Sequence, residues 1–214
     1  MKARYGLLAM IAVTALAGCK HSGDIVVNQG VGITALRTVC PAVGIPDYTG
    51  DITLFRGDAR TADAIDVEAV MTDVRTTCDD SGPKVYSEAH FKVLARRSDT
   101  RGARTVNLPY FSIVLRGGSA VVTKRVGTVS IHFADGQART EADGAAGAYI
   151  NRADATLPPD IVRRINRKRK AGDADAAIDP LTEPDVKAAL DRANFELLVG
   201  FQLSDEQLAY NATR

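Results

Sequence analysis

Tryptophan is absent from the 214 residues, and histidine, cysteine and methionine each occur only three times. Nucleophilic catalysis usually needs a base, most often histidine, close to its nucleophile. The sequence also lacks G-x-S-x-G, H-E-x-x-H and C-x-x-C patterns. An excess of one charge is missing too, because the formal net charge is +1, and this excludes a general attraction to nucleic acid. The chain therefore shows no reaction signature and predicts no cofactor.

An uncharged stretch follows two cations at the amino end. Lys2 and Arg4 precede Tyr5 to Gly18, which carries no charge and ends in small residues. This layout is typical of an export signal. As a helix the stretch would be about 21 Å long, shorter than the roughly 30 Å hydrocarbon core of a membrane. Residues 1–18 are therefore predicted to be a cleaved signal peptide rather than a membrane span.

The end of this stretch is marked by a cysteine. Leu16, Ala17, Gly18 and Cys19 resemble the lipobox of bacterial lipoproteins. The resemblance implies that Cys19 becomes the amino terminus and carries two or three acyl chains, enough for a stable membrane anchor. In Gram-negative lipoproteins an aspartate after the cysteine commonly retains the protein at the inner membrane. Lys20 stands there, so the resemblance implies a lipid-anchored protein at the periplasmic face of the outer membrane.

Cleavage leaves 214 − 18 = 196 residues, with a formal charge of +1 − 2 = −1 because two cations are lost. A chain of this length suits one domain with a real core. Residues 19–32 mix polar residues with glycine and are predicted to be a lipidated tether, with a candidate strand over 25–27. Residues 33–214 are predicted to form a single mainly-β domain.

Two cysteines remain beyond the lipidation site. An exported protein stays in a compartment where disulfides persist, so Cys40 and Cys78 are predicted to form a structural bridge. A loop of this length would contribute roughly 4 kcal/mol in the chain-entropy model. Buried free thiols and a redox pair are the alternatives.

Apolar residues alternate with polar ones over much of the middle of the chain. Alternation at every second position indicates strands with one buried face. The turn-forming sequences between these segments are DDSGPK, RSDTRG, RGGS and ADGQ. The pattern predicts an antiparallel meander of about five strands from Ile65 to about Arg152. Two earlier strands are predicted over Ile33–Val39 and Asp51–Arg56.

About seven strands suggest an antiparallel β-sandwich, similar in architecture to immunoglobulin-like or fibronectin-like modules. A small closed β-barrel is the alternative. Helices are predicted at about 158–193, where Thr182 and Asp185 resemble a capping box, and at 204–211, after a box of Ser204 and Gln207. Between these helical parts, FELLVGFQL alternates from Phe195 and predicts a strand that returns to the sheet.

A dense basic segment is the most conspicuous charged feature. It consists of Arg163, Arg164, Arg167, Lys168, Arg169 and Lys170. On a helix, Arg163, Arg167 and Lys170 would share one stripe, suited to anionic lipid head groups or an acidic partner. The alternative is a solvated helix end neutralised by the aspartates and glutamates that follow.

Four weaker patterns resemble chemical sites. His90 and His132 each lie between apolar neighbours, so both are predicted to lie on exposed strand faces. Ser81 and Lys84 match a Ser-x-x-Lys spacing but lie in a predicted turn. GVGITA lacks a following helix pattern, and DADAAID lacks the ordered ligand progression of a calcium loop. No metal site is predicted.

The functional hypothesis is a non-catalytic, membrane-anchored interaction or assembly module with an envelope protein as partner. Strand edges and the basic segment are its candidate contact surfaces. The first alternative is a carrier for an apolar or lipid-like ligand held inside a barrel or between sheets. An enzyme whose groups converge only in three dimensions is the second.

Overall fold

Strands dominate the part of the protein that the computed structural model describes, residues 38–170 and 172–213. The strands are β1 (Ala42–Gly44), β2 (Asp51–Phe55), β3 (Ile65–Asp79), β4 (Lys84–Arg97), β5 (Arg104–Arg116), β6 (Ala120–Phe133), β7 (Arg139–Asn151) and β8 (Phe195–Phe201). The helices are α1 (Pro159–Ile165), α2 (Pro184–Ala193) and α3 (Asp205–Thr213), with 3-10 turns η2 (Ala62–Ala64) and η3 (Pro180–Thr182). The predicted mainly-β class is confirmed.

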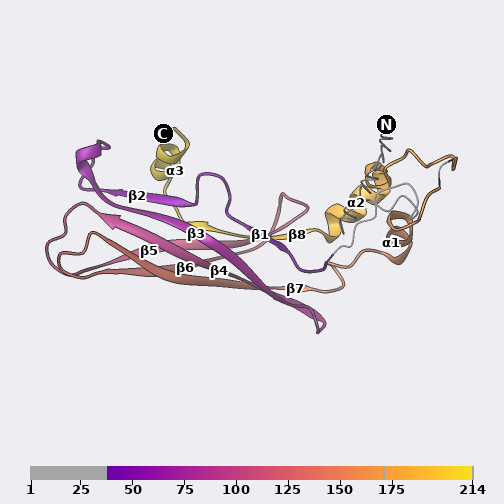
Figure 1. Ribbon diagram of the computed structural model, residues 1–214, viewed down its shortest axis with the longest axis horizontal. Coiled ribbons are helices and arrows are strands. Elements are labelled where there is room, and N and C mark those ends of the chain that lie inside the picture. Colours follow the sequence, from indigo (N-terminus) through magenta and orange to yellow (C-terminus); the bar gives the residue numbers. More distant parts are fainter. Residues whose placement is uncertain (1–37, 171, 214) are drawn as a thin grey trace, which may run out of the picture.

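The strands form two four-stranded sheets, in the orders β2-β3-β4-β7 and β1-β8-β5-β6. All neighbouring pairs are antiparallel except β1 and β8, which run parallel. The long strands lie along the longest axis of the molecule, with α1 and α2 at one end (Figure 1). This sandwich-like arrangement confirms the predicted architecture.

The predicted meander is only partly the observed topology. β3 pairs with β4, and β5 pairs with β6, as hairpins. β7 then pairs with β4 instead of β6, so the chain changes sheet after β4 and again after β6. Alternation indicates which face of a strand is buried, but it does not determine which strand lies next to it. Packing the β3–β4 hairpin against the β5–β6 hairpin buries the apolar faces of both.

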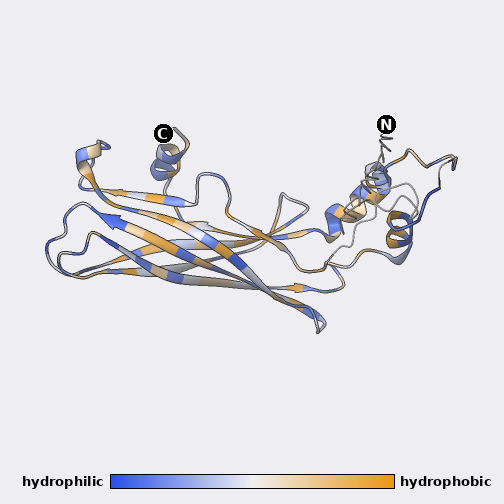
Figure 2. Ribbon diagram, viewed as in Figure 1, coloured by the Kyte–Doolittle hydropathy of each residue, from blue (hydrophilic) through white to orange (hydrophobic). Residues whose placement is uncertain are grey.

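The core lies between the two sheets. Alternate strand residues point inward, and hydrophobic and hydrophilic segments alternate along the strands in Figure 2. The largest fully buried side chains of this core include Leu108, Ile131, Phe133, Leu197 and Phe201. A second, smaller cluster joins α1 and α2 through Leu157, Ile161, Ile165, Val186 and Ala189. The helical end thus has a small core of its own.

Several predictions fall outside the described residues. These are the signal peptide, the lipobox with Cys19, the tether, GVGITA and most of the strand predicted over Ile33–Val39. The two described residues of that strand, Thr38 and Val39, are not in a strand, and the parallel strand β1 begins three residues later. Three residues bounded by proline are too short for a periodic signal.

The helical region differs from the prediction in two places. The helix predicted through the basic segment ends at Ile165, and residues 166–170 and 172–179 are not helical. The capping box at Thr182 is wrong, because Glu183 is the N-cap of α2 and makes no side-chain cap. Pro184 stands at the first helical position and its fixed φ starts the helix instead. The box at Ser204 and Gln207 is confirmed by reciprocal hydrogen bonds of 2.9 and 3.2 Å.

Candidate functional site

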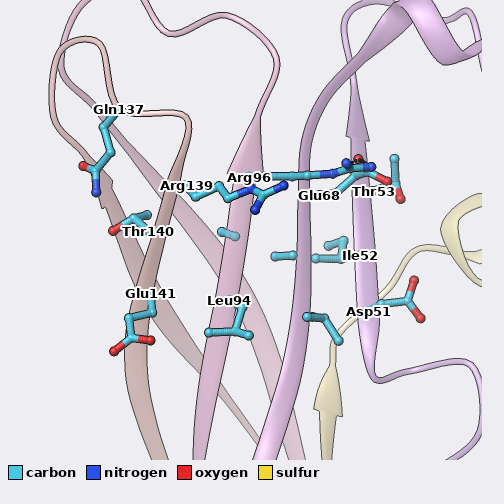
Figure 3. Close-up of a pocket in the computed structure, with 13 residues that line it drawn as sticks. Asp51, Ile52, Thr53, Glu68, Leu94, Arg96, Gln137, Arg139, Thr140 and Glu141 are labelled. Atoms are coloured by element: carbon cyan, nitrogen blue, oxygen red, sulfur yellow. Dashed lines mark hydrogen bonds and ion pairs between the residues drawn. The ribbon is translucent and has the colours of Figure 1, made fainter.

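A groove of about 700 Å³ crosses the solvent-facing side of the β2-β3-β4-β7 sheet. We call it the outer groove. Its lining comes from all four strands and from the loop between β6 and β7 (Figure 3). The lining residues are Asp51, Ile52, Thr53, Glu68, Ala69, Val70, Leu94, Ala95, Arg96, Gln137, Arg139, Thr140 and Glu141.

Two apolar side chains form the centre of the outer groove. Val70 and Leu94 face each other in the β3–β4 register and are 43% and 41% exposed. Their chain neighbours Ala69 and Ala95 point into the core and are buried, so alternation forces Val70 and Leu94 outward. Apolar residues at outward positions leave hydrophobic surface in water, which is a feature of contact sites.

Charged side chains border this apolar centre. Arg96 Nε donates to Glu68 Oε2 at 2.6 Å, and Arg139 lies opposite Arg96 in the register. Arg139 extends toward Arg96 in Figure 3 and has no ion-pair partner within the described ranges. On the other side, Lys92 Nζ lies 3.1 Å from Asp143 Oδ1. This carboxylate and that of Glu141 raise the pKa of Lys92. The groove is thus amphipathic.

Arg97 fixes the loops at this end of the sandwich. Its side chain is buried and donates to the carbonyl oxygens of Thr100, Gly102, Ala134 and Gln137 at 2.7 to 2.9 Å. These carbonyls satisfy a charge that would be costly to bury alone. Because the loop between β6 and β7 supplies Gln137, this clamp also positions one wall of the outer groove.

The two strand histidines do not come together. His90 lies on β4 in one sheet, and His132 lies on β6 in the other. His90 Nε2 is 3.3 Å from Glu88 Oε2, and Tyr86 Oη donates to Glu88 at 3.1 Å. Desolvation and this carboxylate raise the pKa of Tyr86, which opposes its use as a nucleophile. His132 Nδ1 contacts Thr105 at 3.2 Å. Neither histidine lines the outer groove.

The weaker sequence patterns have structural roles. Ser81 lies in the β3–β4 hairpin loop, where its amide donates to Asp79 Oδ1, and Lys84 begins β4. Within the described part of the chain, no three histidine, cysteine, aspartate or glutamate residues gather as a metal site would require. DADAAID forms turns, and Asp175 in it pairs with Arg167.

The predicted disulfide is present between Cys40 and Cys78, with Cα atoms 6.1 Å apart. It ties the residues just before β1 to the far end of β3. The bridge therefore holds the beginning of the described chain at the end of the sandwich where β3 turns into β4.

The basic segment does not form the predicted stripe. Arg164 pairs with Glu183 and Asp185, and these carboxylates raise its pKa while the pKa of Asp185 falls. Arg167 pairs with Asp175. Arg169 is buried, with Nε 3.5 Å from Asp175 Oδ2. Half of the segment is therefore held by internal carboxylates, while Arg163, Lys168 and Lys170 remain exposed.

Comparisons with known protein families, curated proteins and solved structures gave no match. No helix within residues 38–170 and 172–213 is long and apolar enough to cross a membrane.

The outer groove was missed in the sequence because alternation assigned the apolar series to the inward face. Val70 and Leu94 break that alternation as apolar residues at outward positions, and that break was the available signal. Their proximity depends on register, which alternation does not specify.

Proposed function

We propose that this protein is a lipid-anchored lipoprotein of the cell envelope that acts as a non-catalytic interaction module, with the outer groove as a contact surface. The observation that carries the proposal is the exposed apolar centre of that groove, Val70 and Leu94, within a border of charged side chains. An apolar centre with a polar rim is the usual anatomy of a protein interface.

The position of the disulfide supports this arrangement. A tether from lipidated Cys19 would reach the fold near Cys40, at the Cys78 end of β3. Cys78 lies opposite Ser87, and Leu94 is 94 − 87 = 7 residues further along β4. At roughly 3.4 Å per residue the groove lies about 24 Å from the bridge. The outer groove would thus face away from the anchored end, where a partner can reach it.

The remaining exposed cations suit the opposite, membrane-facing end. Arg163 lies on α1, and Lys168 and Lys170 follow that helix in the chain. α1 itself follows β7 close to the β3–β4 hairpin, where Arg152 N donates to Pro83 O at 3.0 Å. Cations near an anionic membrane surface contribute about 1 kcal/mol each. They would orient the module on an outer-membrane inner leaflet, which is the location that Lys20 implies.

The filled core argues against the alternative of a ligand carrier. A carrier of the expected kind holds its ligand between the sheets. That space is occupied by fully buried side chains of both sheets, among them Leu108, Phe133, Leu197 and Phe201.

A site-specific photo-cross-linker tests the proposal in native envelopes. Placed at Leu94, it should capture one protein partner in stoichiometric yield. The matched control is Leu208 of α3, which has the same 41% exposure but lies outside the groove. Capture at position 94, absent at 208 and lost in Cys19→Ser, supports an anchored module. Equal capture at both positions, or capture of lipid alone at 94, would contradict it.

A further inference from the structure

The first half of β6 is an open strand edge. Among residues 38–170 and 172–213, β5 is the only strand hydrogen-bonded to β6. Val121, Val122 and Val126 are 61%, 54% and 60% exposed, whereas Val129 and Phe133 later in the same strand are buried. An unpaired strand edge offers backbone N–H and C=O groups to any extended chain.

The neighbouring strand β7 does not close this edge. β7 belongs to the other sheet and pairs with β4. The nearby link between the sheets is a side chain, since Tyr110 Oη donates to the carbonyl oxygen of Ala145 on β7 at 2.8 Å. Tyr149 of β7 is 62% exposed. Exposed valine side chains of β6 and the exposed Tyr149 of β7 thus lie beside the unpaired backbone of β6.

The open edge carries two adjacent cations. Lys124 and Arg125 are consecutive, so their side chains leave the strand on opposite sides. Lys124 Nζ lies 5.4 Å from the centroid of the Phe111 ring, and Arg125 acts electrostatically on Tyr86. Neither cation has a carboxylate partner among the described ion pairs. Cations on an edge discourage pairing with a second copy, which would bring the same charges.

We propose that Ala120–Thr128 of β6 binds an extended segment of a partner protein as an added strand, with two adjacent acidic residues opposite Lys124 and Arg125 and β-branched apolar residues on either side. The backbone of the edge supplies affinity, and the valines and cations supply selectivity. This inference rests on the proposed function for the existence of a partner, but it uses a different surface from the outer groove.

Peptide binding to the purified full-length protein tests the proposal. The probe is an eight-residue fluorescent peptide, blocked at both ends, with two central glutamates between valines and threonines. We expect it to bind at least about tenfold more tightly than the same peptide with two central lysines. The double variant Lys124→Glu/Arg125→Glu should reverse this preference. The control Lys187→Glu/Arg192→Glu changes the net charge equally at exposed sites of α2 and should leave the preference intact.

A third peptide separates strand addition from simple charge attraction. Methylation of alternate backbone nitrogens removes the donors that a new strand needs, so this glutamate peptide should bind at least about tenfold more weakly. Equal binding of the methylated peptide, no preference for glutamate, or a dimer of the protein through β6 would each overturn the proposal. If these peptides fail while position 94 still captures a partner, only the strand-addition proposal falls. If the peptides bind but position 94 captures nothing, the role of the outer groove falls instead.

Discussion

β2 and β6 are both edge strands, but a helix covers only β2 among the described elements. α3 packs against β2, where Asn211 Nδ2 donates to the carbonyl oxygens of Tyr48 and Asp51, each at 2.8 Å. Tyr210 also packs edge-on against Phe55 of β2, with ring centroids 5.2 Å apart. The first half of β6 has no such helix among the described elements and relies on two cations. A covered edge serves stability, whereas an exposed charged edge remains available for a partner.

Removing α3 should have the largest effect, because it makes the covered edge resemble the open one. A chain ending at Leu203 loses one hydrogen bond and one aromatic contact to β2, and a second hydrogen bond to Tyr48 just before the strand. We expect the free energy of unfolding to fall by about 3 kcal/mol. Without cations like those of β6, the uncovered edge should also promote association. Urea denaturation and analytical ultracentrifugation would measure both effects. A monomer of unchanged stability would show that α3 does not protect β2.

Asn211→Ala breaks the same cover with a single change. The carbonyl oxygens of Tyr48 and Asp51 would lose the amide donor. We expect a loss of about 2 kcal/mol in the free energy of unfolding. Leu208→Ser, on the exposed side of the same helix, is the control and should change stability little. If both variants lost the same amount, helix content rather than edge cover would explain the result.

An ion pair joins the strands behind the two edges. Asp66 of β3 accepts from Arg104 Nη1 and Nη2 of β5 at 2.8 and 2.6 Å, which lowers the pKa of Asp66. Its contribution is complete above the unfolded-state pKa, near 3.9, and is lost as pH falls through the lower folded-state value. We expect Asp66→Asn to cost about 1 kcal/mol at neutral pH.

The pH dependence provides the control for Asp66→Asn. The difference in unfolding free energy between wild type and variant should begin to shrink as pH falls below about 4, because Asp66 of the unfolded chain then binds a proton. It should vanish below the lower folded-state pKa, where Asp66 is uncharged in both states. A difference that stayed constant down to pH 2 would mean that shape, not charge, explains the loss.

The smallest effect is expected at the open edge itself. Val126→Thr removes little buried surface, so stability should change by less than about 0.5 kcal/mol. Val129→Thr, three residues later in the buried half of β6, should cost about 2 kcal/mol because it buries a hydroxyl. Thermal denaturation of the two variants measures the contrast. Equal losses would mean that the first half of β6 is packed against something.

Sequence patterns predicted the long strands and the disulfide more readily than the surfaces. Strands β3 to β6 were recoverable because apolar residues alternate over them and glycines such as Gly136, with φ of 75°, mark the turns. The outer groove and the open edge depend on which strands become neighbours. Packing between the sheets determines which strands are neighbours, and the alternation of apolar residues does not predict it. The helix through Arg167 failed because Asp175 holds this cation in a loop.

Hydrogen exchange of the purified full-length protein tests the difference between the edges most directly. We predict that amides of Ala120–Thr128 exchange faster than those of β2, and that the two-glutamate peptide slows exchange in β6 but not in β2. Slow exchange in the first half of β6 without peptide would contradict the account. So would peptide binding that leaves β6 exchange unchanged.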